Sequence, residues 1–166
     1  MSHGTITLVG PDIARQAEFL AMADEFGEDV PEGLVPSTSR WVVQDGRLVG
    51  FVALRHELNA FLFEEGGYIG YAVRPTARGR GIATAAAALA LLEARHLAIE
   101  RVLLTCDDAN VASATVIERN GGVLEDVRGG KRRYWVEPAG QGPRSTRRAL
   151  PAPGIHQQVC LLVVRG

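Results

Sequence analysis

A strand that runs through a glycine-containing loop directly into a long helix is the feature that most constrains this chain. The segment reads Tyr71-Ala72-Val73-Arg74-Pro75-Thr76-Ala77-Arg78-Gly79-Arg80-Gly81-Ile82-Ala83-Thr84. The first N–H groups of a helix lack intrahelical partners, and with the helix dipole they place about half a positive charge at that end. Arg78 and Arg80 add cations there, which costs up to about 1 kcal/mol each unless an anion offsets them. Gly79 and Gly81 let a ligand approach the backbone closely. The segment therefore predicts a cradle for a phosphate or pyrophosphate.

Three other interpretations of this segment are open to test. The first is a capped helix whose arginines are merely exposed. The P-loop pattern requires Gly-Lys-Ser/Thr, and the loop contains no lysine. The dinucleotide fingerprint is matched only as Gly79-x-Gly81-x-x-Thr84, with Asp107 or Asp108 as the acidic ribose partner. That fingerprint normally follows the first strand, whereas four predicted strands precede the loop here, so it is the second choice among phosphate binders.

The remaining patterns predict a mixed α/β (α+β) fold with the element order β-α-β-β-β-α-β-α-β-β. Alternating or β-branched stretches predict strands over 5–9, 39–44, 47–56, 68–73, 101–105, 123–127 and 132–136. Helical spacing predicts helices over 12–26, 78–96 and 110–120. In the second helix the predicted apolar stripe is Ile82, Ala85, Ala86, Leu89 and Leu92. Asp45-Gly46 predicts a tight hairpin turn.

The composition limits the classes of function. The chain has 166 residues, 46% of them hydrophobic and 22% charged, which is typical of one soluble globular domain. A net charge of −1 gives no sign of a nucleic-acid-binding surface. No apolar run is long enough for a membrane span, and Met1–Thr5 does not resemble a signal peptide, so we expect a cytoplasmic protein. Cys106 and Cys160 lie far apart with no metal-ligand spacing, so we expect neither a metal site nor a disulfide.

The end of the chain differs in character from the rest. We expect one domain over residues 1–136 and a Pro/Gly-rich linker over 137–154. Residues 155–166 contain an apolar run that predicts a C-terminal strand. We expect this strand to dock on an exposed sheet edge, either its own or that of a second subunit, and an exchanged strand would make a homodimer.

Two motifs resemble those of the GNAT superfamily of acetyl-CoA-dependent N-acetyltransferases. Arg78-Gly79-Arg80-Gly81-Ile82-Ala83 resembles the superfamily's (Gln/Arg)-x-x-Gly-x-(Gly/Ala) motif, with Val73-x-Pro75 before it. The stretch 110–122 resembles the second cofactor motif, an Asn with a small residue three positions later and a helix that ends in Gly. The resemblance covers roughly residues 5–136. It implies a mostly antiparallel central sheet, flanked by helices, with two splayed neighbouring strands that form the cofactor cleft.

The resemblance also implies acetyl-CoA as cosubstrate and an amine-bearing acceptor. Backbone N–H groups from Gly79 to Thr84 would hold the pyrophosphate, and a backbone N–H at or beside Val73 would polarise the thioester carbonyl. The implied cofactor-binding residues are Ala72, Val73, Arg78, Gly79, Arg80, Gly81, Ile82, Ala83, Thr84, Asn110 and Ser113.

The catalytic residues are less constrained. Many members have a tyrosine seven residues after the Asn of the second motif, and it protonates the leaving thiolate. Here that position is Ile117, so Tyr134 or Ser113 would have to substitute, or the thiolate leaves unaided. An attacking ammonium must also lose a proton, and the candidate groups lie on or before the splayed strand. We favour Glu57, Glu65 and Tyr68.

The predicted function is therefore transfer of an acetyl group from acetyl-CoA to a primary amine by direct attack in a ternary complex. A non-catalytic acyl-CoA-binding regulatory module is the alternative, and Ile117 is the residue that favours it. A dinucleotide-dependent oxidoreductase is the third hypothesis. The sequence does not identify the acceptor.

Overall fold

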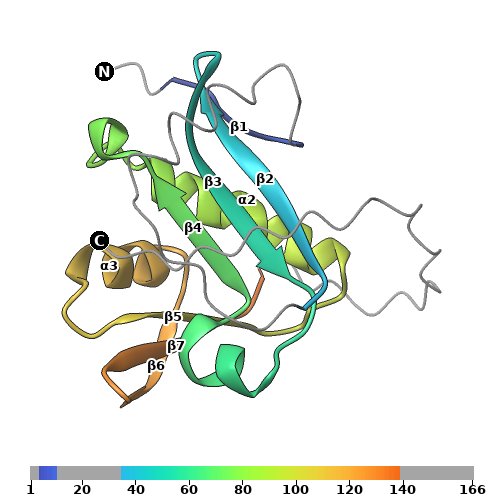
Figure 1. The fold of residues 1–166 in the computed structure, drawn as a ribbon, viewed down its shortest axis with the longest axis vertical. Helices are drawn as coiled ribbons and strands as arrows, with labels where there is room; N and C mark the ends of the chain where they lie inside the picture. The colour runs from blue at the N-terminus through green and yellow to red at the C-terminus, as the bar shows by residue number, and fades with distance from the viewer. Residues whose placement is uncertain (1–3, 11–34, 139–166) are drawn as a thin grey trace.

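The computed structural model of the protein describes residues 4–10 and 35–138 (Figure 1). Its strands form a four-stranded antiparallel sheet of order β1-β2-β3-β4 and a three-stranded antiparallel sheet of order β5-β7-β6. The strands are β1 (Ile6–Val9), β2 (Ser37–Gln44), β3 (Arg47–Arg55), β4 (Ile69–Val73), β5 (Val102–Asp107), β6 (Val123–Arg128) and β7 (Lys131–Val136). The helical elements are the π-helix η2 (Leu62–Gly66), the 3₁₀-helix η3 (Pro75–Ala77), α2 (Ile82–His96) and α3 (Val111–Arg119). The predicted mixed, mostly antiparallel fold is confirmed.

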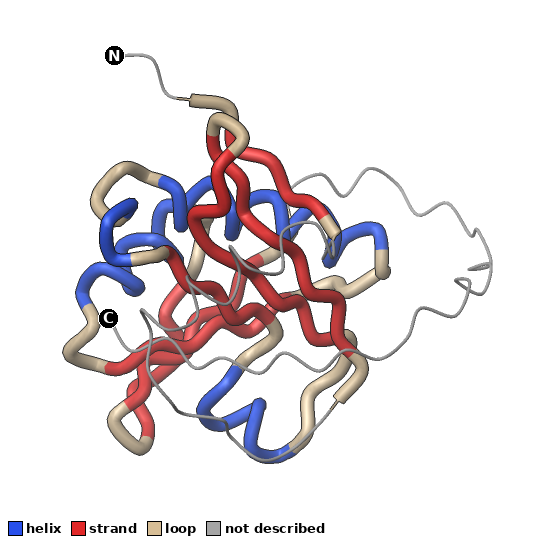
Figure 2. Tube along the Cα trace, turned by 45° about the horizontal axis from the view of Figure 1, so that its top comes forward, coloured by secondary structure: helices blue, strands red, loops and turns tan. Residues whose placement is uncertain are grey.

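Helix α2 covers one face of the larger sheet, where it contacts β1, β3 and β4, and α3 packs beside α2 and β5 (Figures 1 and 2). The main hydrophobic core fills the space between these helices and the sheets. A smaller cluster lies on the opposite face of the larger sheet and contains Trp41, Leu48, Phe51 and Ala72. Alternate residues of β4 therefore enter different clusters, as the two-residue period of a strand requires.

The buried face of α2 is turned around the helix axis relative to the predicted stripe and consists mostly of alanine. Its buried residues are Ile82, Ala86, Ala87, Ala90, Leu91 and Ala94. The predicted stripe was wrong at Leu92, which is 47% exposed, and Ala85 and Leu89 are only partly buried. A row of alanines lets the helix lie close to the sheet, and that gain in packing outweighs the larger apolar area of Leu92.

Some sequence predictions fall outside the described residues. These are the helix over 12–26 and the C-terminal strand within 155–166. Within the described part, every predicted strand is present. The predicted loop before β4 contains one additional element, η2, which packs against β5 and β7.

Candidate functional site

Strands β4 and β5 lie side by side at one end and belong to different sheets beyond it. They meet where the Tyr68 N–H donates to the Leu103 carbonyl at 2.7 Å. Gly67 permits this approach, because a Cβ atom on it would lie 2.6 Å from the Leu103 carbonyl oxygen. Farther along, Tyr71 and Cys106 line one cavity between the two strands. The two strands therefore run in the same direction and splay apart, and the splaying agrees with what the family resemblance implied.

The backbone of β4 directs hydrogen-bonding groups into this gap. Arg74 N–H donates to the Val49 carbonyl at 2.9 Å, which sets the alternation of hydrogen-bonded pairs between β3 and β4. By that alternation Ala72 bonds to β3, whereas the N–H and C=O groups of Tyr71 and Val73 point away from β3. The Val73 carbonyl accepts a hydrogen bond from Arg78 Nε at 3.1 Å. The Val73 N–H thus remains as a donor facing the gap.

Helix α2 starts four residues later than predicted, directly after the loop in which the sequence predicts a phosphate cradle. Gly79 and Gly81 have φ values of 73° and 75°, which a right-handed helix excludes, so α2 begins at Ile82. No side chain caps this end, and the first intrahelical bond runs from Ala85 N–H to the Gly81 carbonyl at 3.1 Å. The preceding N–H groups are therefore available to a ligand. They border a groove of about 500 Å³, a volume suited to a cofactor.

Helix α3 forms the other wall of this groove. The Asn110 side chain accepts a hydrogen bond from the Ser113 N–H at 3.0 Å and caps the helix, which explains the spacing of the second motif. At the other end, Asn120 Nδ2 donates to the Thr84 carbonyl at 3.2 Å and to the Val116 carbonyl at 2.9 Å. Asn120 thereby ties α3 to the first turn of α2 and fixes the width of the groove.

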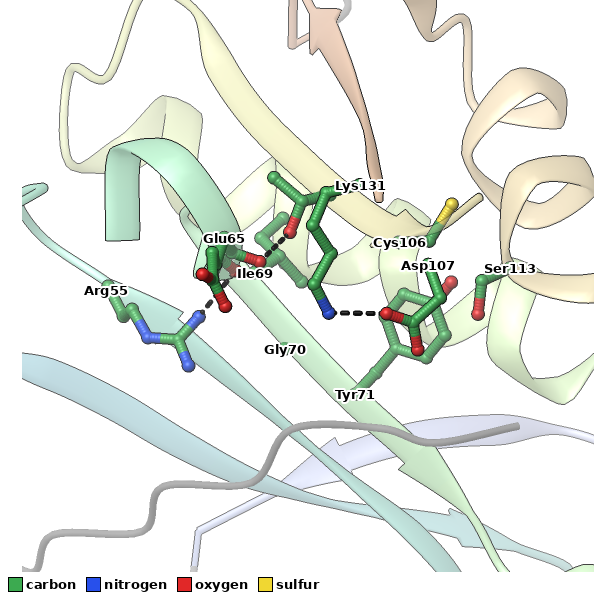
Figure 3. Close-up of a pocket in the computed structure, with 11 residues that line it drawn as sticks. Arg55, Glu65, Ile69, Gly70, Tyr71, Cys106, Asp107, Ser113 and Lys131 are labelled. Carbon is green, nitrogen blue, oxygen red and sulfur yellow. Dashed lines mark hydrogen bonds and ion pairs between the residues drawn. The ribbon is translucent and has the colours of Figure 1, made fainter. Parts of the chain in front are cut away.

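A second, smaller cavity of about 50 Å³ lies between β4 and β5 (Figure 3). This is the space of roughly three or four water molecules. Its walls come from six elements, β3, η2, β4, β5, α3 and β7, and Figure 3 shows the Tyr71 ring beside Asp107 and Ser113. Tyr71 and Ser113 line both this cavity and the groove. The two spaces therefore adjoin at the splayed strands.

Buried arginines hold η2 at the rim of this cavity. Arg55 is 4% exposed, and its Nη1 donates to the carbonyls of Gly66 and Gly67, both at 3.0 Å. Arg133 Nη1 donates to the Phe63 carbonyl at 2.9 Å. Thr105 on β5 donates a hydrogen bond to the Glu65 carbonyl. These contacts fix the backbone that carries the Glu65 carboxylate.

Burial shapes the charges around the cavity. It raises the pKa of the Tyr71 hydroxyl and of the Cys106 thiol, so both stay protonated at neutral pH. Lys131 Nζ pairs with Asp107 at 2.5 Å. The cavity thus combines neutral donors with a carboxylate at its rim, Glu65, that forms no ion pair with the residues that the structure describes.

Most of the residues predicted to bind the cofactor come together at the groove. Those that line it are Val73, Arg78, Gly79, Gly81, Ile82, Ala83, Thr84, Asn110 and Ser113. Arg80 is exposed nearby, and its Nε donates to the Ala77 carbonyl at 3.3 Å. The Ala72 side chain lies in the cluster on the other face of the sheet.

The three catalytic candidates separate in space. Glu65 lines the small cavity, whereas Glu57 and Tyr68 line neither space. Ile117 is 1% exposed in the core, and the Tyr134 hydroxyl is occupied by a hydrogen bond to Glu118 at 3.0 Å.

Sequence reasoning missed the cavity residues that come from distant strands. These are Arg55, Tyr71, Thr105, Cys106, Asp107 and Lys131. Only Tyr71 carried a signal, since it lies two positions before Val73 and therefore on the same face of β4.

Residues 4–10 and 35–138 hold no group of three or more His, Cys, Asp or Glu that could bind a metal ion. Over the same ranges, no helix has the length and apolar character needed to cross a bilayer.

Comparison with known proteins identifies the class. The model of the acetyltransferase (GNAT) family matches residues 12–122. No curated protein matches the sequence. Because the family model covers more than half of the chain, the chain belongs to the acetyltransferase (GNAT) family. It is therefore an acetyltransferase with acetyl-CoA as its cosubstrate, and this decides against the dinucleotide hypothesis.

Solved structures share the fold at low sequence identity. An acetyltransferase from Agrobacterium tumefaciens is 20% identical with a TM-score of 0.61, over 80% of this chain and 90% of that chain. The microcin C7 self-immunity acetyltransferase MccE, solved with acetyl-CoA and AMP, is 16% identical with a TM-score of 0.60, over 80% and 92%. The GNAT domain of PAT from S. lividans is 12% identical with a TM-score of 0.61, over 80% and 89%. At these identities the likeness shows a common fold and nothing finer.

The groove fits the cosubstrate that the family uses. A Cβ atom on Gly79 or Gly81 would point into open space, so these positions leave room at uncapped N–H groups where an anion is favoured. Arg78 lines the same space.

Proposed function

We propose that the protein transfers the acetyl group of acetyl-CoA to the primary amine of an acceptor by direct attack, with both substrates bound at once. The observation that carries the proposal is that the groove and the small cavity share Tyr71 and Ser113. A thioester entering from the groove and an amine entering through the cavity would meet beside β4. Such a meeting supplies the proximity that a bimolecular transfer needs.

Residues of the groove would bind and orient the cosubstrate. The N–H groups from Gly81 to Thr84 hold the pyrophosphate at the positive end of α2. Asn110 and Ser113 border the pantetheine path on the α3 side. The Val73 N–H, which faces the gap, donates to the thioester carbonyl oxygen and stabilises the charge that develops there. Acetyl-CoA supplies the activated acyl group.

Glu65 is the candidate base that the geometry supports. It lines the cavity, and its backbone is fixed by Thr105 and by the neighbouring contacts of Arg55. A carboxylate at the rim can accept a proton from the incoming ammonium through water. Neither Glu57 nor Tyr68 lines the cavity.

The alternative function is an acyl-CoA-binding module without catalysis. One observation supports it: Ile117, at the position where many family members have a tyrosine acid, is buried in the core. A thiol-release assay separates the two. Acetyl-CoA is incubated with small polyamines, amino acids, an aminoglycoside, and peptides that carry a free N-terminus or an internal lysine. Release of CoA thiol that depends on at least one amine is expected. Tight binding of acetyl-CoA with no release above the rate without amine would favour the non-catalytic module.

The cytoplasmic location, the lack of nucleic-acid binding and the homodimer stay predictions from the sequence. The acceptor is proposed only as an amine. The spermidine/spermine N-acetyltransferase SpeG of Vibrio cholerae and the ribosomal L7/L12 acetyltransferase RimL, both similar in fold, are named for amines of very different size.

A further inference from the structure

Tyr71 is a buried tyrosine whose hydroxyl lies near the Ser113 side chain but makes no hydrogen bond of good geometry with any of the described residues. The residue is 9% exposed and belongs to β4, one of the two splayed strands. Its hydroxyl faces Ser113 and Cys106, and its side chain lines both the groove and the cavity (Figure 3). A buried polar group without a partner costs stability, so a bound molecule is the natural source of that partner.

Several other hydroxyl groups are engaged or lie elsewhere, whereas the Ser113 hydroxyl lies beside Tyr71 and Ser113 also lines both spaces. The Thr115 hydroxyl donates to the Val111 carbonyl at 2.8 Å, within its own helix. Tyr134 bonds to Glu118 and lines neither space. Ile117, at the position where many family members have their acid, offers no polar group.

We propose that Tyr71 is the hydrogen-bond donor and proton source for the sulfur that leaves when the acetyl group is transferred. The amine lone pair forms the new C–N bond, the C–S bond breaks, and its electron pair stays on sulfur. The Tyr71 O–H proton moves to the sulfur. The amine nitrogen loses a proton as the amide forms, and this proton passes by way of the cavity rim to the Tyr71 oxygen. The products are the N-acetyl amine and the CoA thiol.

The surroundings of Tyr71 suit a donor. Burial raises its pKa, so the hydroxyl carries its proton at neutral pH until negative charge develops beside it. A hydrogen bond is stronger when its acceptor is charged, so a substrate group that becomes charged during the reaction gives the Tyr71 hydroxyl a strong partner. The charged and titratable groups around the cavity are Arg55, Glu65, Cys106, Asp107 and Lys131.

The inference rests on the proposed function, so its test uses CoA alone and needs no acceptor. Thiolate absorbance of bound CoA is titrated against pH, and the spectrum of the desulfo-CoA complex is subtracted to remove the protein's own tyrosines and cysteines. A hydrogen bond to the thiolate favours its charged form. The thiol of CoA bound to the parent protein should therefore ionise about one pH unit lower than in the Tyr71→Phe variant. The Ser113→Ala variant should keep most of this shift.

The melting temperature provides a second readout. Tyr71→Phe removes a hydroxyl that has no well-formed hydrogen bond to any residue of 4–10 or 35–138, so the variant should melt at the same or a higher temperature. A lower melting temperature would show that the hydroxyl serves the fold and would overturn the inference. Identical thiol ionisation in parent and variant, loss of the shift only in Ser113→Ala, or loss of CoA binding in a folded Tyr71→Phe variant would overturn it as well. Failure of the parent protein to bind CoA would instead reject the proposed function, and the inference with it.

Discussion

Gly81 precedes α2 and lines the groove where we place the pyrophosphate. Its φ of 75° costs a residue with a Cβ atom about 1–2 kcal/mol, and that Cβ would point into open space beside the helix N–H groups. Gly81→Ala should therefore fold with slightly reduced stability and bind CoA at least tenfold more weakly, as measured by calorimetric titration.

Gly130 provides the matched control. It lies in the turn between β6 and β7 with a φ of 78°, and a Cβ there would also meet nothing. Gly130→Ala should lose the same amount of stability because the backbone strain is equal, while its affinity for CoA stays unchanged. Equal affinity in the two variants would remove the pyrophosphate from this helix end.

Glu65 is the second residue whose role can be isolated. If its carboxylate takes the proton from the acceptor ammonium, Glu65→Gln should lower kcat about tenfold or more and leave the affinity for acetyl-CoA unchanged. Glu57→Gln and Tyr68→Phe, which alter groups outside both spaces, should change kcat far less. A larger effect at either of these positions than at Glu65 would reject the assignment.

At the scale of elements, Arg133 connects η2 to the smaller sheet. Its side chain is 2% exposed, and its Nη2 and Nε bond to Glu125 and Asp126 at 2.7 and 2.8 Å. The guanidinium also lies 4.8 Å from the centre of the Phe63 ring. One buried cation thus organises the segment that carries Glu65.

Replacing this cation should loosen the segment. Arg133→Met should lower the free energy of unfolding by roughly 2–3 kcal/mol, since several charge-assisted hydrogen bonds are lost while their carboxylate partners regain water. Arg132→Met is the control, because Arg132 forms a half-exposed pair with Asp108 and such pairs contribute about 0–1 kcal/mol. Urea unfolding measures both, and comparable losses would contradict the role of Arg133.

The same network predicts a pH dependence. The hydrogen bond from Arg133 holds the pKa of Asp126 below its ordinary value. A carboxyl with a lowered folded-state pKa stabilises the fold above its unfolded pKa of about 3.9 and loses that contribution as the pH falls further. The stability deficit of Asp126→Asn relative to the parent should therefore be constant from pH 7 to about 5 and shrink toward pH 3. A deficit that does not change over this range would show that the Asp126 charge contributes nothing.

Local patterns predicted the elements but not their details. The sequence patterns predicted every described strand, because the alternation of apolar and polar residues and the turn residues are local signals that span only a few positions. It placed the start of α2 at residue 78, since the alanine run hides the fact that Gly79 and Gly81 take positive φ. It missed η2, whose five residues show no apolar period and which is held by Arg133 and Thr105 from distant strands.

At the scale of the whole molecule, the groove was predictable and the cavity was not. The groove consists of two contiguous motifs, and each motif contains its own helix start. The cavity brings together Arg55, Thr105 and Lys131. These residues lie on three strands of two sheets and come close only where the two sheets contact each other. No single sequence window contains that information.

The C-terminal region carries the last prediction. Residues 139–166 lie outside the described structure, and their sequence contains the apolar run Val159–Val164. Strand β6 is an edge of the smaller sheet over the described residues, with Val123, Leu124 and Val127 about half or more exposed. We expect the run to cover such an edge, since burying each large apolar side chain contributes about 1.5–3 kcal/mol.

Truncation after Gly140 tests this expectation. The shortened protein should melt at a lower temperature, and light scattering should show half the parent mass if the strand is exchanged between subunits. If the melting temperature and the number of subunits from light scattering are both unchanged, the run has no structural role.

We place acetyl-CoA along the α2–α3 groove, with its thioester in the gap between β4 and β5. A crystal structure of the protein with CoA measures this directly. We expect the pyrophosphate within hydrogen-bonding distance of the N–H groups of Gly81–Thr84, and the sulfur next to Tyr71. A pyrophosphate bound elsewhere, or a sulfur outside the gap between the two strands, would contradict it.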